Sequence, residues 1–340
     1  MRSVGMSMTM PDETEPGRPE PDGTGAAYQS LRPLMFAIAY RMLGSVTEAE
    51  DIVQEAFLRY HRALAGHTSP DSPKAYLSAV TTRLCIDHAR SARARREAYV
   101  GEWLPEPLLT GSAGSAGRPA DPAELAERSD SLSMAFLLLL ERLSPVERAV
   151  FLLHDVFSYG YDETARIVGK SEGNCRQLCH RARQHVSEHR PRYEPSPVHR
   201  AELASRFFAA VDHGDLDGLV SMLAADVTVY GDSGGMRPAW PRPITGRDKV
   251  SRLLVSLGGQ ARAVGAAFRP AQVNGQPGAV VVDREGNLVS VMALDIADGQ
   301  VRAVRSVISR DKLRHLGPLA DVGGLIREFR QAGAPEDESR

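Results

Sequence analysis

Residues 161–171 read YDETARIVGKS, and residues 172–186 continue as EGNCRQLCHRARQHV. This pattern predicts two helices joined by a tight turn. Small Ala165 allows the helices to cross closely, Gly169 supplies the turn, and Ser171 caps the second helix. The two segments therefore predict a helix-turn-helix unit.

The second helix of this unit has two different faces. Its apolar face carries Cys175, Leu178, Cys179, Ala182 and Val186. Its polar face carries Asn174, Arg176, Gln177, His180, Arg181 and Arg183. Amides and cations of this kind bind base edges and phosphates, so we expect the polar face to contact DNA. The alternative is an ordinary helical hairpin with a solvated basic face.

The cysteines have a structural interpretation. Cys175 and Cys179 lie one turn apart beside His180, which suggests a metal site, but both cysteines already belong to the apolar face. We therefore predict no metal and no cofactor. With Cys85 as the third cysteine, the set fits a reduced compartment better than a disulfide framework.

The helix-turn-helix unit belongs to a predicted all-α domain over residues 129–190. Apolar residues recur at helical spacing over residues 132–140, and residues 144–147 read SPVE, a capping box with proline at the first helical position. A second all-α domain is predicted over residues 26–98, where apolar residues repeat at spacings of three and four.

Prolines and glycines mark the limits of these domains. Residues 99–128 are predicted to form a flexible linker, because prolines and glycines exclude a continuous helix or strand there. Residues 198–318 pass from helical patterns to valine-rich strands, which predicts an α+β domain. Residues 1–25 are predicted to be a disordered tail, and residues 319–340 a C-terminal tail.

The bulk composition fits a cytoplasmic, multi-domain protein. The chain has 340 residues, of which 42% are hydrophobic and 25% charged. No apolar run approaches the roughly 20 residues that a membrane span needs, so we expect no membrane contact. The net charge of -2 hides a basic stretch at residues 83–96, where five arginines accompany one aspartate. Such a stretch is typical of an anion-binding surface.

Three motifs resemble those of bacterial RNA polymerase sigma factors of the extracytoplasmic-function type. Residues 143–148 (LSPVER) and 161–165 (YDETA) resemble their region four, and residues 49–57 (AEDIVQEAF) resemble their region two. The resemblance implies a region two helical bundle and a region four helix-turn-helix. It also implies that the chain directs core RNA polymerase to promoter DNA and initiates transcription.

The resemblance also assigns roles to residues of the first domain. In the family, the region two motif docks onto a coiled coil of the polymerase clamp, and the matching polar positions here are Asp51, Gln54 and Glu55. Residues 75–96 resemble the segment that recognises and melts the minus-ten element, with Tyr76 where the family commonly has Trp. The side chains expected to hold phosphates there are Arg83, Arg90, Arg93, Arg95 and Arg96.

The third block resembles the SnoaL-like family, an α+β cone of helices on a curved sheet that encloses a pocket. One sigma factor subgroup carries this extension and shows three elements, which read here WLPEP at residues 103–107, DSGGM at 232–236 and DKL at 311–313. Ser233 and Met236 depart from the subgroup loop, and Arg237 could supply its cation. The resemblance implies a regulatory interface formed by Trp103, Pro105, Asp232, Gly234, Gly235, Arg237, Asp311 and Lys312.

Other interpretations of the third block stay open. A pocket of this fold can bind a small-molecule ligand, and Asp232, Asp295 or His213 could serve as the general base of an enzyme. We predict no enzymatic activity, because Asp232 lies in a glycine-rich turn where aspartate is often only a turn-former. For the whole chain, the alternative is a helix-turn-helix regulator with a ligand-binding or enzymatic SnoaL-like domain. Residues 51–57 argue against a regulator, which needs no clamp-binding helix.

Overall fold

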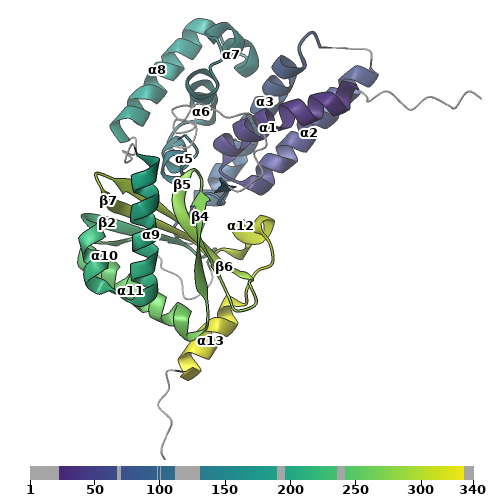
Figure 1. The fold of residues 1–340 in the computed structure, drawn as a ribbon. Helices are drawn as coiled ribbons and strands as arrows, with labels where there is room; N and C mark the ends of the chain where they lie inside the picture. The colour runs from purple at the N-terminus through teal and green to yellow at the C-terminus, as the bar shows by residue number, and fades with distance from the viewer. Residues whose placement is uncertain are drawn as a thin grey trace, which may run out of the picture.

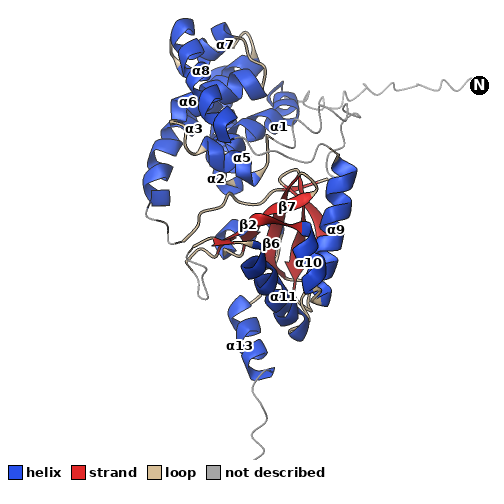
Figure 2. Cartoon of the chain, turned by 90° about the vertical axis from the view of Figure 1, so that its left-hand side faces the viewer, coloured by secondary structure: helices blue, strands red, loops and turns tan. Residues whose placement is uncertain are grey.

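The computed structural model describes residues 23–66, 70–97, 99, 101–111, 131–189, 196–235 and 242–332. Two helical domains lie together, and an α+β domain lies below them in the view of Figure 1. Figure 2 shows the same division, with the sheet confined to the lower part. Residues 101–111, which we call the strap, run between the helical domains and the α+β domain.

The N-terminal domain is a three-helix bundle. It consists of α1 (Gly23–Leu43), α2 (Val46–Ala65) and α3 (Pro73–Glu97). The chain turns between α1 and α2 at Gly44, which has a φ of 68°. Ser45 then caps α2, because its hydroxyl accepts a hydrogen bond from the backbone N–H of Glu48. The apolar stripe of α2 is buried in the bundle, as its spacing predicts.

The second helical domain contains the predicted helix-turn-helix. Its elements are α5 (Met134–Leu140), α6 (Pro145–Phe151), the π-helical turn η1 (Leu152–Val156), α7 (Tyr161–Val168) and α8 (Glu172–His189). The capping box is present, with hydrogen bonds in both directions between Ser144 and Glu147. Gly169 ends α7 in the left-handed conformation with a φ of 68°. Helices α7 and α8 confirm the predicted fold of this domain.

The C-terminal domain folds helices against one mixed sheet. Its helices are α9 (Pro197–His213), α10 (Leu216–Met222), α11 (Arg247–Ala263), α12 (Arg310–Leu313), the 3-10 turn η2 (Arg314–Leu316) and α13 (Val322–Ala332). Its strands are β2 (Leu223–Asp232), β3 (Ile244–Thr245), β4 (Ala267–Val273), β5 (Gln276–Val282), β6 (Leu288–Ala297) and β7 (Gln300–Val307). A further strand, β1 (Leu109–Thr110), comes from the strap.

The strand order is β1-β4-β5-β6-β7-β2-β3, and every neighbouring pair is antiparallel except β2 with β7. One face of the sheet packs against α9, α10 and α11 around Phe207 and Leu254. The opposite face packs against Leu104 of the strap, Met134 of α5 and Leu313 of α12. The strap and the second helical domain therefore cover the face that the domain's own helices α9 to α11 leave open. The predicted α+β fold of the C-terminal domain is confirmed.

The path of the strap differs from the prediction. Residues 99–128 are predicted to form a flexible linker, but the strap is extended and ends in β1, which pairs with β4. The cause is a set of partners on the C-terminal domain. The backbone N–H of Leu108 donates to Asn274 Oδ1 at 2.9 Å, across 166 residues of sequence, so no local pattern reveals the contact.

The C-terminal tail differs from the prediction as well. Residues 319–340 are predicted to be a tail, but residues 322–332 form α13, which lies at the bottom of Figure 1. Leu325 and Phe329 of this helix pack against the core of the C-terminal domain. The apolar spacing of Val322, Leu325 and Phe329 is the signal that the prediction missed.

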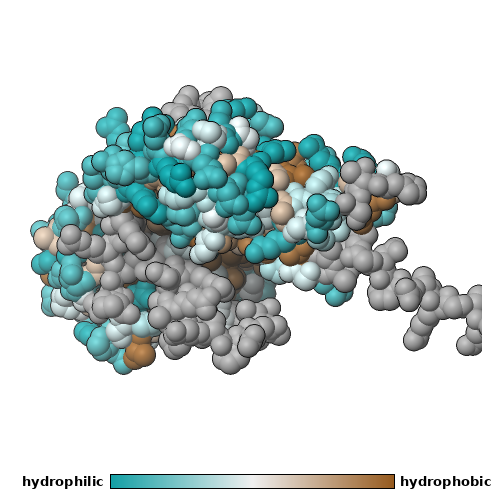
Figure 3. Space-filling view, turned by 90° about the horizontal axis from the view of Figure 1, so that it is seen from above, coloured by the Kyte–Doolittle hydropathy of each residue, from teal (hydrophilic) through white to brown (hydrophobic). Residues whose placement is uncertain are grey.

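The surface over the helical domains is mainly hydrophilic when seen from above, with small apolar areas (Figure 3). Among the described helices, none is both long enough and apolar enough to cross a membrane.

Candidate functional site

Helix α8 presents the predicted DNA-contacting side chains to solvent. Asn174, Arg176, Gln177, His180, Arg181 and Arg183 are all exposed. Cys175 and Cys179 are fully buried beneath them and hold α8 against α6. Burial raises the pKa of both thiols, so they stay protonated and apolar. The helix therefore separates a packing face from a face that can enter a DNA groove.

The cations of α8 differ in how far they are engaged. Arg183 binds both carboxylate oxygens of Asp155, at 2.8 and 2.5 Å, so it anchors the C-terminal half of the helix to η1. Arg176 pairs with Glu172 at 3.0 Å in an exposed contact that water screens. Asn174, Gln177 and His180 extend from the same exposed half. The side chains in the half of α8 that follows the turn are thus less engaged within the protein, and they are better placed to contact bases.

Helix α2 carries the predicted polymerase-binding residues on its outer face. Asp51 and Gln54 are exposed, and Glu55 is half-buried and pairs with Arg59 at 2.7 Å. Leu58 is 52% exposed on the same helix, three and four residues beyond Glu55 and Gln54. Leu58 thus adds an apolar side chain to the exposed face that carries Asp51 and Gln54, and the sequence analysis did not single it out.

Helix α3 carries the predicted phosphate-binding arginines. Arg83 donates from Nε to Ile167 O at 2.9 Å and from Nη2 to Arg166 O at 3.0 Å. These carbonyls end α7, where a cation is favourable. Arg83 therefore bridges the two helical domains here, and a DNA contact through these nitrogens requires the domains to separate. Arg90 is exposed and pairs with Asp87 at 3.1 Å. The side chains of Arg93, Arg95 and Arg96 lie outside the described residues.

Further hydrogen bonds join the two helical domains. The hydroxyls of Ser78 and Tyr159 lie 2.7 Å apart, and Arg148 Nη1 donates to Met42 O at 2.6 Å. All four residues belong to one shared contact region between α1, α3 and the second domain. The domains thus adopt a closed arrangement relative to each other.

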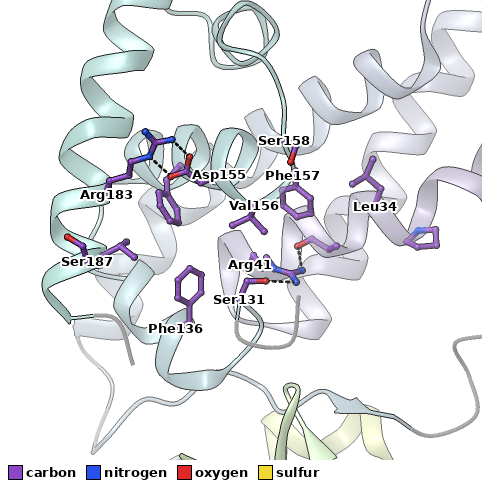
Figure 4. Close-up of a pocket in the computed structure, with 14 residues that line it drawn as sticks. Leu34, Arg41, Ser131, Phe136, Asp155, Val156, Phe157, Ser158, Arg183 and Ser187 are labelled. Atoms are coloured by element: carbon purple, nitrogen blue, oxygen red, sulfur yellow. Dashed lines mark hydrogen bonds and ion pairs between the residues drawn. The ribbon is translucent and has the colours of Figure 1, made fainter. Parts of the chain in front are cut away.

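A cavity of about 990 Å³ lies at this junction, between α1, η1 and α8 (Figure 4). Arg41 reaches into it from α1 and donates to Ser131 Oγ at 3.2 Å. The Asp155–Arg183 pair lines its other side. The lining comes from both helical domains, so this space belongs to the contact between them.

A buried carboxylate fixes the strap to the C-terminal domain. Asp232, at the end of β2, is 0% exposed. Its Oδ1 accepts hydrogen bonds from the Tyr99 hydroxyl at 2.5 Å and from the backbone N–H of Gly234 at 3.0 Å. Its Oδ2 accepts from the backbone N–H of Leu104 at 2.8 Å and from Lys312 Nζ at 2.5 Å. Since a buried carboxylate is costly without such donors, Asp232 ties these segments together.

Aromatic rings surround the Lys312 ammonium. Its Nζ lies 4.5 Å from the centroid of the Trp103 ring and 4.7 Å from that of Tyr99, within cation–π range. Trp103 also closes against Gly44, where an added Cβ would lie 2.9 Å from the ring. Burial, followed by the Asp232 contact, raises the pKa of the Tyr99 hydroxyl, so Tyr99 remains a donor.

The next part of the strap holds the start of α2. Glu106 Oε1 accepts from the Ser45 hydroxyl at 2.7 Å, and Oε2 accepts from the backbone N–H groups of Val46 at 2.8 Å and Thr47 at 3.1 Å. These N–H groups lack partners within the helix, and a carboxylate at a helix N-terminus is favourable. The strap therefore caps the helix that carries Asp51.

Asn274 connects the strap to both helical domains. This buried residue, with a φ of 53°, begins the turn after β4. Its Nδ2 donates to the Tyr40 hydroxyl at 2.7 Å and to Leu132 O at 3.0 Å. Tyr40 in turn donates to Glu106 O at 2.6 Å. One asparagine thus contacts α1, the strap and the start of the second helical domain.

The structure brings most residues of the predicted regulatory interface together. Trp103, Asp232, Gly234 and Lys312 meet in the cluster just described, and buried Pro105 lies beside Gly44. Asp311 points to solvent and pairs with Arg314 at 2.8 Å, and Gly235 is exposed in the turn. Arg237 lies outside the described residues. A regulatory role for these residues stays a prediction.

Sequence reasoning missed several members of this contact. Tyr99 and His315 give no local signal, and His315 Nε2 lies 2.8 Å from Pro107 O. Glu106 belongs to the WLPEP element but was not assigned a helix-capping role. Asn274 followed by Gly275 predicts only a turn. The turn at residues 274–278 (NGQPG) also fits the sigma factor subgroup, but the sequence does not indicate that Asn274 is buried against the strap.

Comparison with known proteins agrees with these observations. A model of Sigma-70 region 2 matches residues 27–95, and a model of Sigma-70 region 4 matches residues 133–186. The chain is 38% identical over 298 residues to the ECF RNA polymerase sigma factor SigJ of Mycobacterium tuberculosis, covering 84% of this chain and 91% of SigJ. It is 34% identical over 304 residues to the probable ECF sigma factor SigI of the same species, covering 89% and 98%.

The crystal structure of SigJ superimposes with a TM-score of 0.66 and 34% identity, covering 87% of this chain and 99% of SigJ. The match therefore extends over both helical domains and the SnoaL-like C-terminal domain. The two sigma region models and the near full-length relatives show that the chain belongs to the extracytoplasmic-function family of RNA polymerase sigma factors, in the form that carries a SnoaL-like C-terminal extension.

Proposed function

We propose that this sigma factor binds core RNA polymerase through the outer face of α2 and reads promoter DNA through α8 and α3. The exposed Asp51, Gln54 and Leu58 form the polymerase surface. The exposed amides and cations of α8 bind the upstream promoter element, and the basic end of α3 holds the opened downstream strand. The chain works in the cytoplasm, where RNA polymerase and its promoters are found.

The C-terminal domain regulates this activity by holding the strap. One observation carries the proposal: the strap is bonded to Asp232 on one side and, through Glu106, to the start of α2 on the other. The strap precedes the second helical domain in the chain, so its position limits how far the two DNA-binding domains can move apart. That separation decides whether both promoter elements can be bound at once.

We expect no catalytic role for the regulatory domain. Asp232 is wholly buried, and its oxygens are occupied by four donors. Asp295 binds Arg305 with one oxygen at 2.8 and 3.0 Å, and His213 is hydrogen-bonded to Ala209 O at 2.7 Å. None of these three groups lines the cavity of the domain, so none can act there as the general base.

Reconstituted transcription tests the regulatory role. Core polymerase is programmed with the full chain or its Glu106→Gln variant, which weakens the carboxylate contacts to the N-terminus of α2. Promoter output at a fixed sigma concentration should change about threefold or more, since a loss of 1 kcal/mol shifts an equilibrium by roughly fivefold. The control is Glu102→Gln, in the same strap. Equal output from all three proteins would overturn the proposal.

A further inference from the structure

The C-terminal domain has a cavity of about 720 Å³, partly open to solvent, between the sheet, α11 and α13. Apolar side chains dominate its lining, among them Leu254, Val264, Phe268, Met292, Leu325 and Phe329. Small-molecule sites in proteins have this size and this character, with a few polar groups that set the orientation of the ligand. The space is therefore suited to a mostly apolar molecule.

Three serines of the lining, which define its serine end, come from neighbouring strands of the sheet. Ser290 and Ser306 lie on neighbouring strands β6 and β7 and are 7% and 5% exposed, and Ser233 follows β2. The Ser290 and Ser306 hydroxyls have no hydrogen-bond partner within the described residues. Among the described residues of the lining, the charged ones are Arg310 and Asp321, both exposed. A hydroxyl or carbonyl oxygen fits the serine end, whereas a charged group would lack a buried counter-charge.

Helix α13 forms the wall through which a ligand can enter. Its Leu325, Ile326 and Phe329 line the cavity. Its polar side is tied to the domain by Glu328, which pairs with Arg284 at 3.1 Å with both side chains about half exposed. Exposed pairs of this kind contribute roughly 0 to 1 kcal/mol, so α13 is held mainly by the packing of Leu325 and Phe329 against the core, a contact that an apolar ligand in the cavity can replace. Figure 1 places this helix at the end of the molecule, away from the helical domains.

We propose that this cavity binds an uncharged lipophilic molecule with a hydroxyl or carbonyl oxygen at the serine end, and that α13 is its lid. The inference deepens the proposed regulation, because Ser233 and Ile308 border the cavity beside the Asp232 cluster. The backbone N–H of Ile308 donates to Asp232 O at 2.7 Å. A ligand at this end therefore contacts residues next to Asp232, the carboxylate that holds the strap.

Fluorescence titration of the full chain with N-phenyl-1-naphthylamine, an uncharged lipophilic probe, tests the site. Saturable binding is expected, and 1-decanol should displace the probe at a concentration about tenfold lower than decanoate does. No saturable binding would overturn the proposal. Equal displacement by the alcohol and the carboxylate would overturn the expected chemistry of the ligand.

Substitutions locate the bound probe. Ala261→Trp fills the cavity and should weaken binding about tenfold or more, with an unchanged circular dichroism spectrum. Ala263→Trp, exposed on the same helix, and Ala37→Trp, in the cavity between the helical domains, are the matched controls and should bind normally. Normal binding by A261W would overturn the assignment. Gln260→Trp supplies the same test if A261W does not fold.

The lid has its own measurement. Phe329→Ala removes a large side chain from the inner face of α13, so the probe should dissociate faster in stopped flow. Unchanged dissociation would contradict entry past α13. Because these assays contain no polymerase or DNA, probe binding can succeed while the regulatory proposal fails in transcription, and the reverse is equally visible.

Discussion

Lys312 Nζ lies 2.5 Å from Asp232 Oδ2 in an ion pair whose side chains are only 10% and 0% exposed. The same ammonium donates to Leu104 O at 2.6 Å, so the pair encloses the backbone of the strap. Two charges separated by 80 residues of sequence thus meet where the strap crosses the C-terminal domain. Removing either member of such a pair leaves the other charge buried without a counter-charge, which is destabilising.

The first prediction concerns this pair. Asp232→Ala leaves the Lys312 ammonium buried without its counter-charge and should lower the free energy of unfolding of the C-terminal domain by about 3 to 5 kcal/mol. Thermal unfolding followed by circular dichroism measures the loss. The control is Asp311→Ala, one residue before the lysine but exposed, which should stay within about 0.5 kcal/mol. Identical unfolding of the two variants would contradict a structural role for the pair.

A second prediction concerns the outer face of α2. Asp51→Arg should weaken binding to core polymerase about tenfold or more, because it reverses a charge on the proposed contact surface. Helicity should not change, since Asp51 is exposed. Asp217→Arg makes the same charge change on exposed α10 and should bind normally. Fluorescence anisotropy with labelled sigma factor gives both affinities, and wild-type affinity for Asp51→Arg would remove α2 from the interface.

A third prediction concerns sequence reading by α8. Gln177→Ala removes an exposed amide from the half of the helix that follows the turn, and should cost about 1 to 3 kcal/mol on the preferred upstream element. The loss should be smaller on a mutated element. Gln184→Ala, exposed two turns further along, is the control. Competition binding of the polymerase holoenzyme to both DNAs measures the difference, and an equal loss on both would make Gln177 a phosphate contact.

The helical domains were predictable because their signals are local. The capping box at Ser144, the turn at Gly169 and the apolar stripe of α2 each lie within a few residues of the structure they specify. The contacts of the strap, in contrast, are made by residues far apart in the sequence. Leu104 and Asp232 are 128 residues apart, so neither sequence neighbourhood indicates a partner. Family resemblance indicated that these elements belong to one interface, but not that Asp232 would be buried among four donors.

Position on a helix predicted which arginines are exposed. It did not predict which of them are already bound to other groups of the chain. The face assignment of α8 placed Arg183 in solvent, where the structure has it, yet both of its paired nitrogens bind Asp155. Arg83 is likewise exposed, but it donates to carbonyls of α7. Whether a surface cation is already engaged depends on how domains pack, and helical spacing carries no information about that.

A fourth prediction concerns the closed arrangement of the helical domains. Arg83→Met removes two hydrogen bonds to the end of α7 while keeping much of the side-chain length. The domains should then separate more often, which raises the mean distance between fluorophores attached to α2 and α8. Arg90→Met alters an exposed arginine on the same helix and is the control. If single-molecule energy transfer shows the same distances in both variants, Arg83 does not hold the domains together.

The last prediction tests whether Trp103 and Asp232 act through one contact. Burying an aromatic ring commonly contributes about 2 to 3 kcal/mol, and Trp103 shares the Lys312 ammonium with Asp232. Trp103→Ala and Asp232→Asn should therefore change promoter output in the same direction, and the double variant should differ little from the stronger single variant. Groups that share a partner are non-additive in this way. A matched cycle of Trp103→Ala with Asp298→Asn, at an exposed hairpin turn on the same domain, should be additive. Reconstituted transcription on one promoter measures the wild type and all five variants. Additive effects of Trp103 and Asp232 would mean that the two residues act separately, and the strap would then not transmit the state of the C-terminal domain through this cluster.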